Sequence, residues 1–543
     1  MQDELIARAE TWLAEDPDPE TREELAELIA AKDVPELTAR FSGTLQFGTA
    51  GLRGELGAGP MRMNRAVVIR AAAGLAAYLK KQGETDGLVV IGYDARHKSA
   101  DFARDTAAVM TGAGLRAAVL PRPLPTPVLA YAIRHLGAVA GVEVTASHNP
   151  PRDNGYKVYL GDGSQIVPPA DAGIAAEIAA VSSLADVLRP DSGWETLDEG
   201  VLNAYLARTD AVLAQDSPRT ARTVYTAMHG VGKDVLLAAF ARAGFPEPVL
   251  VAEQAEPDPD FPTVAFPNPE EPGAMDLAFA KARETGPDLI IANDPDADRC
   301  AVAVRDGAGW RMLRGDEVGA LLAQHLVNRG ARGTFAESIV SSSLLGRIAE
   351  KAGLPYEETL TGFKWIARVD GLRYGYEEAL GYCVDPDGVR DKDGITAALL
   401  ITELASELKE ESRTLLDLLD DIAVEHGLHA TDQLSVRVED LSVIANAMGR
   451  LREQPPTELA GLPITRSEDL TKGTDTLPPT DGLRYTLDGA RVIVRPSGTE
   501  PKLKCYLEVV VPVGSHAELP TAHAKAAELL AGIKRDLSAA AGI

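Results

Sequence analysis

A hydroxyl and an imidazole stand next to each other where a predicted strand ends. Residues 145–150 have the sequence Thr-Ala-Ser-His-Asn-Pro, and they follow a small, aliphatic run at 136–144 that is typical of a buried strand. Prolines at 150 and 151 cannot continue this strand, so Ser147 is expected on a fixed loop. Adjacent residues on an extended chain point to opposite sides, and we therefore expect Ser147 and His148 not to form the hydrogen-bonded pair of a serine hydrolase. The pattern favours a serine that another group activates, with an inert polar turn as the alternative.

Three carboxylates crowd a second strand-end loop. Asp294, Asp296 and Asp298 lie between two apolar runs, 288–292 and 300–304, that are typical of strands. Two unit charges about 4 Å apart interact by ~4 kcal/mol at an effective dielectric of about 20, so three unpaired carboxylates would be costly without a cation. Oxygen ligands indicate magnesium, whereas an EF-hand is excluded because arginines occupy its glycine and glutamate positions. An acidic surface turn is the alternative.

A third loop combines the side chains that bind phosphate. Residues 495–502, Arg-Pro-Ser-Gly-Thr-Glu-Pro-Lys, follow the predicted strand 491–494 and supply a guanidinium, two hydroxyls and an ammonium. A solvated loop is the alternative, against which the flanking Arg495 and Lys502 argue. Residues 375–381 contribute two adjacent glutamates that suit neighbouring sugar hydroxyls, and an exposed charged turn is the alternative there. A further acidic stretch at 385–388, Asp-Pro-Asp-Gly, lacks a third carboxylate, and we interpret it as a turn.

Composition narrows the class of protein. The chain has 543 residues, enough for roughly three to five domains, and its formal net charge of −27 opposes binding to nucleic acid and to anionic membrane surfaces. Its three cysteines lie far apart without a CxxC pair, so neither a disulfide framework nor a zinc site is indicated. An acidic N-terminus and the lack of a membrane-length apolar run predict a soluble, cytoplasmic protein.

The sequence contains no complete nucleotide-binding or serine-hydrolase motif. Residues 112–117 match the residue types of a dinucleotide-binding fingerprint, which must follow a strand and open a helix. Here they follow a helical pattern and lead into a strand, so we interpret them as a helix end. Residues 230–234 end in aspartate where a P-loop has serine or threonine. No GxSxG elbow occurs in the sequence. Nucleotide binding and serine hydrolysis are therefore unsupported.

Helical and strand patterns alternate along most of the chain. Residues 1–40 are helical in pattern, with a capping box that begins at Thr21. Aliphatic strands then alternate with Ala/Leu-rich helices, and we predict these strands at 88–93, 117–120, 139–144, 223–228, 249–252, 288–292 and 334–341. After about residue 430, strands outnumber helices until an Ala-rich terminal helix. The predicted fold class is α/β, with three similar mixed α/β units and a C-terminal α+β domain.

Together the loops resemble the α-D-phosphohexomutase family. A serine loop, a three-aspartate loop, a paired-glutamate loop and an Arg-x-Ser-Gly-Thr loop follow one another in the family's order. The resemblance extends from Phe47 to Lys504 and implies four domains around a central cleft. Residues 153–159 and 362–366 are most similar to the branch that includes enzymes acting on glucose and pentose phosphates. We expect the four domains at 1–208, 209–315, 316–432 and 433–543.

The resemblance implies a role for each candidate residue. Such an enzyme is an isomerase, a phosphoglucomutase or phosphomannomutase, that moves phosphate between C1 and the terminal hydroxyl of a sugar through phosphoserine and a bisphosphate. Ser147 would be the phosphoserine, and one magnesium ion per chain would be held by its phosphoryl oxygen and by Asp294, Asp296 and Asp298. The other catalytic residues that it implies are Arg53, Lys157 and Arg299 along the transferring phosphate, and His148 and Lys392 for proton transfer. The substrate-binding residues that it implies are Glu377 for sugar hydroxyls, and Arg495, Ser497, Gly498 and Thr499 for the phosphate that does not react.

Specificity and some other functions stay open at this stage. A phosphosugar is the implied substrate and a sugar bisphosphate the implied activator, but glucose, mannose, glucosamine and pentose phosphates are all candidates, and we expect a monomer or small homo-oligomer. A phosphosugar phosphatase, in which water intercepts phosphoserine, is one alternative; a silent sugar-phosphate sensor is another, against which the intact Ser147 and Lys392 argue. Many relatives have serine at the position of Ala379 and some have histidine at that of Gly381, so the sugar contacts are expected to differ here.

Overall fold

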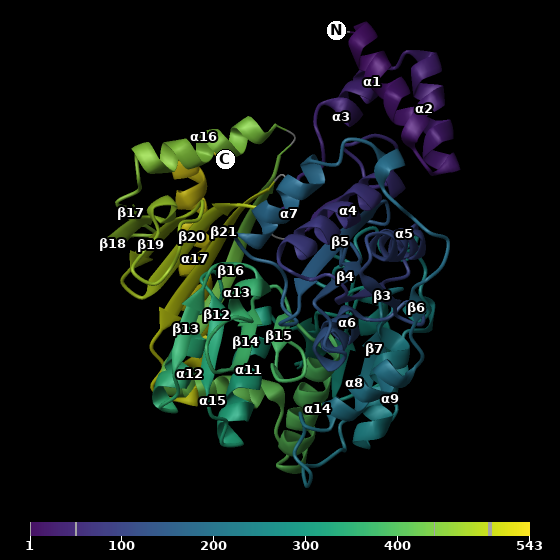
Figure 1. The fold of residues 1–543 in the computed structure, drawn as a ribbon. Coiled ribbons are helices and arrows are strands. Elements are labelled where there is room, and N and C mark those ends of the chain that lie inside the picture. The colour runs from purple at the N-terminus through teal and green to yellow at the C-terminus, as the bar shows by residue number, and fades with distance from the viewer. Residues whose placement is uncertain (1, 49–50, 439, 498–501) are drawn as a thin grey trace. The chain divides into compact units, whose positions relative to one another are not determined.

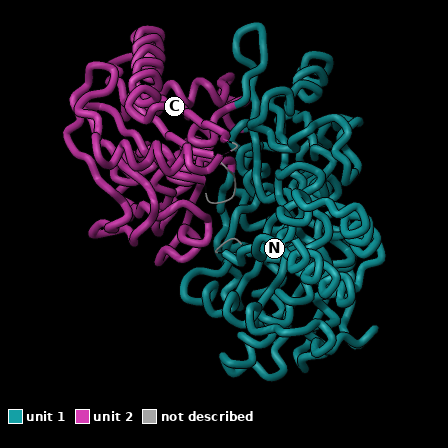
Figure 2. Tube along the Cα trace, turned by 90° about the horizontal axis from the view of Figure 1, so that it is seen from above, with its two compact units in different colours: residues 1–312, 381–406 teal, residues 313–380, 407–543 magenta. Residues whose placement is uncertain are grey.

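The computed structural model describes residues 2–48, 51–438, 440–497 and 502–543, and Figure 1 shows its ribbon. The chain divides into two compact units (Figure 2). The first unit comprises residues 1–312 and 381–406, and the second unit comprises residues 313–380 and 407–543. The first unit is therefore discontinuous in sequence.

Three helices open the first unit, namely α1 (Gln2–Glu15), α2 (Pro19–Ala31) and α3 (Val34–Phe41). Their apolar side chains form a small separate core in which Leu25 and Leu37 are fully buried. The helical interpretation of residues 1–40 therefore agrees with the structure.

The capping box predicted at Thr21 is wrong. Asp18 caps α2 instead, because its side chain accepts a hydrogen bond from the backbone N–H of Glu20 at 3.1 Å and Pro19 occupies the first turn. Thr21 lies within the helix, where its hydroxyl donates to Asp16 at 2.7 Å.

A six-stranded sheet follows, in the order β1-β5-β4-β2-β3-β6. Strand β2 is parallel to β3 and β4, β3 is parallel to β6, and β5 is antiparallel to β1 and β4. The strands are β1 (Leu52–Glu55), β2 (Leu88–Tyr93), β3 (Arg116–Val119), β4 (Ala140–Val144), β5 (Asp153–Leu160) and β6 (Glu195–Thr196). Every residue of β4 is buried, as expected for a parallel strand that helices cover on both faces.

Helices cover both faces of this sheet. They are α4 (Arg65–Lys81), α5 (Ser99–Gly112), α6 (Thr126–His135), α7 (Ala170–Ala179) and α8 (Gly200–Thr209). Residues of α4, α5 and α7 share one core with Val89 and Ile91 of β2. Helix α6 packs on the opposite face, where Ile133 occupies the space that a side chain at Gly141 would need.

The second sheet of the first unit has the order β11-β10-β9-β7-β8. Its strands are β7 (Thr223–Thr226), β8 (Val249–Leu250), β9 (Leu289–Ala292), β10 (Ala301–Asp306) and β11 (Gly309–Met312), with helices α9 (Gly232–Ala243) and α10 (Asp276–Thr285). Strand β7 is parallel to β8 and β9, whereas β10 returns antiparallel to β9. The loop that carries the three aspartates therefore joins β9 to β10.

The segment 381–406 returns to the first unit. It contains β15 (Gly381–Cys383) and most of α14 (Gly394–Glu410). Asp393 precedes α14 and its side chain accepts hydrogen bonds from the N–H groups of Ile395 at 3.0 Å and Thr396 at 3.1 Å, as an N-cap residue does.

The second unit begins with parallel strands. Strand β12 (Thr334–Ser338) lies between β13 (Tyr356–Thr359) and β14 (Leu372–Glu377). The helices of this region are α11 (Gly315–Asn328), α12 (Leu344–Lys351), α13 (Phe363–Ile366) and α15 (Leu415–His426).

The C-terminal sheet is antiparallel, in the order β16-β21-β20-β19-β18-β17. Its strands are β16 (Leu428–Arg437), β17 (Glu458–Leu459), β18 (Leu462–Asp469), β19 (Leu483–Leu487), β20 (Ala490–Pro496) and β21 (Lys502–Val511). Helices α16 (Leu441–Glu453) and α17 (Leu519–Ala541) share its core. Short 3₁₀ segments occur at Leu184–Asp186, Ala252–Gln254, Leu470–Lys472 and His516–Glu518.

The predicted fold class is confirmed, because three mixed α/β regions precede an antiparallel C-terminal α+β region. Strand β2 has the predicted bounds, whereas the run at 136–144 is strand only from Ala140 onward because Leu136 caps α6. Among the helices of the described ranges, none combines the length and apolar character needed to cross a bilayer.

Candidate active site

Ser147 lies on the loop that follows β4, and its backbone has an unusual conformation. Its φ of 51° falls in the left-handed region, which residues other than glycine adopt at a cost. The Ser147 hydroxyl donates to Asp294 Oδ2 at 2.8 Å and lies 3.3 Å from His148 Nδ1. The expectation that the side chains of Ser147 and His148 diverge is therefore wrong. The reason is that the alternation of side chains belongs to extended backbone, which Ser147 does not have.

Arg96, which the sequence reasoning missed, holds this loop in place. Its buried guanidinium donates to four backbone carbonyl oxygens, those of Ser147 at 2.6 Å, Asn149 at 2.6 Å, Pro150 at 2.8 Å and Asp153 at 3.2 Å. Arg96 follows β2, whose carboxyl end lies beside that of its parallel neighbour β4. An arginine just beyond this strand was the available signal, because a guanidinium offers five N–H donors to the carbonyls of a neighbouring loop.

The three aspartates form a compact buried cluster. Carboxylate oxygens of Asp294, Asp296 and Asp298 lie within 4.8 Å of one another, and all three residues are 0% exposed. Among the described residues, Asp296 Oδ1 and Asp298 Oδ1 have no hydrogen-bond partner. Unsatisfied buried carboxylate oxygens are costly, and oxygen donors of this kind suit a hard divalent cation such as Mg²⁺. The residues present therefore fit a magnesium site.

The pKa values of the cluster shift in opposite directions. Burial and the charges of Asp296 and Asp298 raise the pKa of Asp294 well above its usual value. Burial also acts to raise the pKa of Asp298, but Lys157 and Lys392 outweigh it and hold that pKa below its usual value. For Asp296, burial and the charge of Asp298 act upward, and Lys157 again brings the pKa below its usual value. Asp294 is therefore the member of the cluster that most readily takes up a proton.

Cationic side chains face the same carboxylates. Lys157 Nζ on β5 lies 2.8 Å from Asp296 Oδ2 and 3.1 Å from Asp298 Oδ2. Lys392 Nζ lies 3.2 Å from Asp298 Oδ2. Burial acts to lower the pKa of Lys392, but the carboxylates of Asp298 and Asp391 outweigh it and raise that pKa, which keeps the side chain an ammonium ion.

Two arginines complete the group of predicted catalytic residues. Arg299 Nε lies 3.6 Å from Asp294 Oδ2 and 3.8 Å from Asp298 Oδ1. Arg53 on β1 donates to Asn149 Oδ1 at 3.2 Å, within the Ser147 loop. The first unit therefore brings together the predicted nucleophile, the predicted metal ligands and all of the predicted catalytic cations.

Thr126 is a second contact that the sequence did not reveal. It stands at the start of α6, where its hydroxyl donates to Asp296 Oδ2 at 2.6 Å and its N–H donates to the Asp296 carbonyl at 3.0 Å. These bonds fix the aspartate loop against the sheet that carries Ser147. Only the apolar character of α6 was visible in the sequence, and nothing there singled out its first residue.

The predicted substrate-binding residues belong to the second unit. Glu377 ends β14, and its Oε1 accepts a hydrogen bond from the N–H of Gly362 at 2.7 Å. Arg495 lies on β20 in register with Lys504, and the N–H of Ser497 donates to the carbonyl of Lys502 at 2.8 Å. The predicted phosphate-binding residues Gly498 and Thr499 lie outside the described residues.

Gly381 makes room for Lys392. A Cβ atom at position 381 would lie 2.4 Å from Lys392 Cδ and 2.9 Å from its Cγ, distances too short for any side chain. The stem of the lysine thus occupies the volume in which a larger residue would project.

Comparison with known proteins connects this geometry to a described family. Models of the phosphoglucomutase/phosphomannomutase alpha/beta/alpha domains I, II and III and of the C-terminal domain match residues 44–185, 203–307, 314–424 and 435–520. The chain is 52% identical over 457 residues to a probable phosphomannomutase of Haemophilus influenzae, covering 82% of this chain and 93% of the relative. It is 36% identical over 578 residues to the phosphopentomutase of Mus musculus, and the match covers 95% of this chain and 92% of that relative. A structure assigned as a phosphomannomutase from Thermus thermophilus superimposes with a TM-score of 0.70 at 28% identity, covering 90% of this chain and 99% of that one.

Proposed function

Because the chain belongs to the phosphoglucomutase/phosphomannomutase family and is a phosphosugar mutase, we propose that Ser147 is the residue that gives and recovers the phosphoryl group. The observation that carries this assignment is the 2.8 Å hydrogen bond from the Ser147 hydroxyl to Asp294 in a buried, strongly charged cluster. A serine hydroxyl is a weak nucleophile until a neighbouring group accepts its proton, and the hydrogen bond to Asp294 orients this hydroxyl within the cluster.

Phosphoryl transfer depends mainly on fixed positive charge around the moving group. In the proposed reaction the bond from Ser147 Oγ to phosphorus breaks while a sugar hydroxyl forms its own bond to phosphorus, and the hydroxyl proton passes to a base. Lys157, Arg299 and Arg53 supply the positive charge. In the reverse transfer, when Ser147 recovers the phosphoryl group, His148, whose Nδ1 lies 3.3 Å from the serine oxygen, accepts the serine proton, and Lys392 as an ammonium ion donates one to the departing sugar oxygen. In the forward transfer His148 returns its proton to the serine oxygen, and the sugar hydroxyl proton passes to Lys392.

The proposed metal site consists of Asp294, Asp296, Asp298 and an oxygen of phosphorylated Ser147. A bound Mg²⁺ supplies Lewis-acid stabilisation of the charge that develops on the phosphoryl oxygens. The chain's own part is to present three ionised carboxylates, and for Asp294 this requires loss of the proton that its raised pKa favours.

A sugar bisphosphate is the proposed intermediate and activator. After the first transfer the bisphosphate must turn over so that its other phosphate faces Ser147. A phosphate-binding loop that contacts only the phosphate that does not react can bind the bisphosphate in either orientation. We assign that role to Arg495, Ser497, Gly498 and Thr499, and the sugar hydroxyls to Glu377. Glucose and pentose 1-phosphates are the first substrates to test, and a cytoplasmic location and a monomer or small homo-oligomer remain part of the proposal.

The assignment of Ser147 is tested by its phosphorylation. Intact-protein and peptide mass spectrometry of active enzyme incubated with glucose 1,6-bisphosphate is expected to find one phosphoryl group on the peptide that contains Ser147. Ser147→Ala is expected to abolish mutase turnover while sugar-phosphate binding stays measurable. Ser442→Ala, which changes an exposed serine on α16, is the matched control and is expected to behave as the unmodified enzyme. Active enzyme that never carries phosphate at Ser147 would contradict the mechanism.

A further inference from the structure

The acidic turn at 385–388 has no part in the mechanism described so far, yet it lies shortly before Lys392 in the chain. The Asp385 carbonyl accepts hydrogen bonds from the N–H groups of Gly388 and Val389, both at 3.0 Å. A Cβ at position 388 would lie 2.4 Å from Asp385 Oδ2 and 3.0 Å from Arg208 Cγ. The turn therefore folds closely over the Asp385 carboxylate, and a side chain at its last position would displace this carboxylate.

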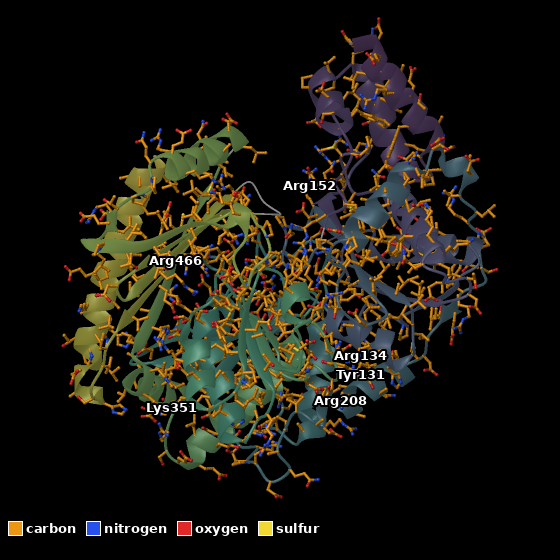
Figure 3. The ribbon with its side chains drawn as sticks, turned by 60° about the vertical axis from the view of Figure 1, so that its left-hand side comes forward. Tyr131, Arg134, Arg152, Arg208, Lys351 and Arg466 are labelled. Atoms are coloured by element: carbon orange, nitrogen blue, oxygen red, sulfur yellow. The ribbon has the colours of Figure 1, made fainter. Side chains whose placement is uncertain are left out.

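Two arginines from the helices of the first sheet hold this turn. Arg208, on α8, forms a two-point hydrogen bond with the Asp385 carboxylate, with Nε to Oδ2 at 2.7 Å and Nη2 to Oδ1 at 2.6 Å. Arg134, on α6, donates to the backbone carbonyls of Pro386 at 3.0 Å and Asp387 at 2.7 Å. Figure 3 labels both arginines. The paired geometry matters because a guanidinium that bonds through two nitrogens fixes direction as well as distance.

The other end of the segment is fixed beside Lys392 itself. Asp391 Oδ2 accepts hydrogen bonds from the Tyr159 hydroxyl at 2.7 Å and from Gln165 Nε2 at 2.9 Å. The Tyr205 hydroxyl donates to the carboxylate of Asp393, at 2.9 Å and 3.0 Å from its two oxygens. The segment 385–393 is thus attached at both ends to the sheet that also carries Ser147 and to the helices that cover it, and Lys392 lies between the attached Asp391 and Asp393.

We propose that Arg208 is a positioning residue for Lys392, acting through Asp385, with Arg134 as a second support of the same turn. This inference rests on the proposed function, because it requires Lys392 to take part in the reaction. A reacting group that shifts by about 1 Å can lose a large factor in rate, so a segment held at one end only is expected to place the ammonium less well. Glu377 and Arg495 lie elsewhere in the chain, so substrate affinity is expected to change little.

Arg208→Met removes the two-point bond and leaves a side chain of similar length. It is expected to lower kcat by about tenfold with KM within about twofold of the unmodified enzyme, whereas Arg208→Lys, which retains one bond to Asp385, is expected to lose less. Arg242→Met is the matched control. Arg242 also pairs through two nitrogens with an aspartate, Asp210, but it lies on α9 and has no contact with the segment 385–393 among the contacts described. Unchanged kcat in Arg208→Met, or an equal loss in Arg242→Met, would overturn the proposal.

A double-mutant cycle separates positioning from general loss of structure. If Arg208 acts through Lys392, Arg208→Met is expected to have little further effect in a Lys392→Met enzyme, with Lys392→Arg as the background should turnover fall below detection. Equal fold-losses in both backgrounds would mean that Arg208 acts by another route, and the inference would fail while the proposed function stands. Unmodified turnover in Lys392→Met would remove the role of Lys392 from the proposed function and the inference with it. Thermal unfolding midpoints of all variants show whether they are folded.

Discussion

Asp296 makes the most demanding set of contacts in the aspartate cluster, because one oxygen receives hydrogen bonds from Thr126 and Lys157 while the other has no partner among the described residues. We predict that Asp296→Asn weakens Mg²⁺ binding and lowers turnover by roughly 10²-fold or more, the scale expected when one element of electrostatic stabilisation is lost. The amide oxygen can still accept hydrogen bonds, so the fold is expected to persist. Titration calorimetry with Mg²⁺ and a coupled mutase assay measure the two effects.

Asp306→Asn is the control for this substitution, because Asp306 is an exposed aspartate on β10 that pairs with Arg311 at 3.1 Å. It is expected to leave both metal binding and turnover unchanged. An Asp296→Asn protein that binds Mg²⁺ as the unmodified enzyme does, or full activity in the presence of a chelator, would show that the cluster has a structural role only.

Ala379 is the residue at which we expect substrate breadth to be set. It lies half-buried in the turn after β14, directly beyond the two glutamates. Where relatives have serine, a hydroxyl can share a sugar hydroxyl with the neighbouring glutamate, and alanine cannot. A net hydrogen bond contributes about 0.5 to 1.5 kcal/mol, so Ala379→Ser is expected to sharpen the discrimination between glucose and pentose 1-phosphates by roughly threefold to tenfold in kcat/KM. Equal kcat/KM ratios before and after the substitution would mean that position 379 does not contact the sugar.

At the scale of elements, the sequence placed the strands in the right regions but made most of them too long, as at 223–228, where β7 ends at Thr226. The run 88–93 is β2 with its predicted bounds because a buried parallel strand is apolar on both faces and this run is bounded by Gly87 and Asp94. At Thr21 the local pattern satisfied a capping box, but Asp18 and Pro19 form a better helix start three residues earlier. The local sequence thus allows two helix starts, and only the structure shows that the helix begins after Asp18.

The candidate site was predictable as a set of residue types but not as a geometry. Ser147 and the three aspartates were visible because nucleophiles and carboxylates cluster after apolar strands. The contact between Ser147 and His148 could not be predicted, because it depends on the positive φ of Ser147. A serine in the sequence gives no indication that its φ is positive. Arg96 was missed because its partners are backbone carbonyls, so its place just beyond β2 was the one sign of its role in the sequence.

Asp393, the cap of α14, gives a prediction about pH. Burial raises its pKa to about 6, against an ordinary value near 3.8. A carboxyl group whose pKa is raised by folding stabilises the fold fully below the unfolded pKa, and that contribution is lost as the pH rises from about 4 to about 6. A shift of about two units corresponds to about 3 kcal/mol. Asp393→Asn retains an oxygen that can cap Ile395 and Thr396 but does not titrate, so its stability relative to the unmodified enzyme is expected to increase over this pH range.

Chemical denaturation at several pH values, with the two proteins compared at each, measures this difference. Asp440→Asn is the control, since Asp440 caps α16 but its pKa is lowered by hydrogen bonds from Ser442, and its stability contribution is lost only as the pH falls through that lower value. A constant difference between Asp393→Asn and the unmodified enzyme across the range would mean that Asp393 does not titrate there.

At the scale of the whole molecule, the net charge of the chain has the same sign as its proposed substrate. The chain carries a formal net charge of −27, while its proposed substrate is an anion. The net charge therefore opposes long-range attraction of an anion, and under the proposed function binding depends on short-range contacts with cations such as Arg53, Lys157 and Arg495.

The division into two units leads to the last prediction. All of the proposed metal ligands, Ser147 and the three aspartates, belong to the first unit. A ligand that binds only the folded state stabilises what it binds, by about 2.7 kcal/mol at a concentration of about 100 times its Kd. We therefore predict that Mg²⁺ slows amide hydrogen exchange in peptides from β4, β5 and β9 of the first unit and leaves peptides from β19 to β21 of the second unit unchanged. Mass spectrometry of exchange after chelation and after readdition of Mg²⁺ measures this, with Asp296→Asn as the protein in which the effect is lost. Equal slowing in both units would mean that metal binding is coupled to the whole chain, and no slowing in the first unit would place the metal elsewhere.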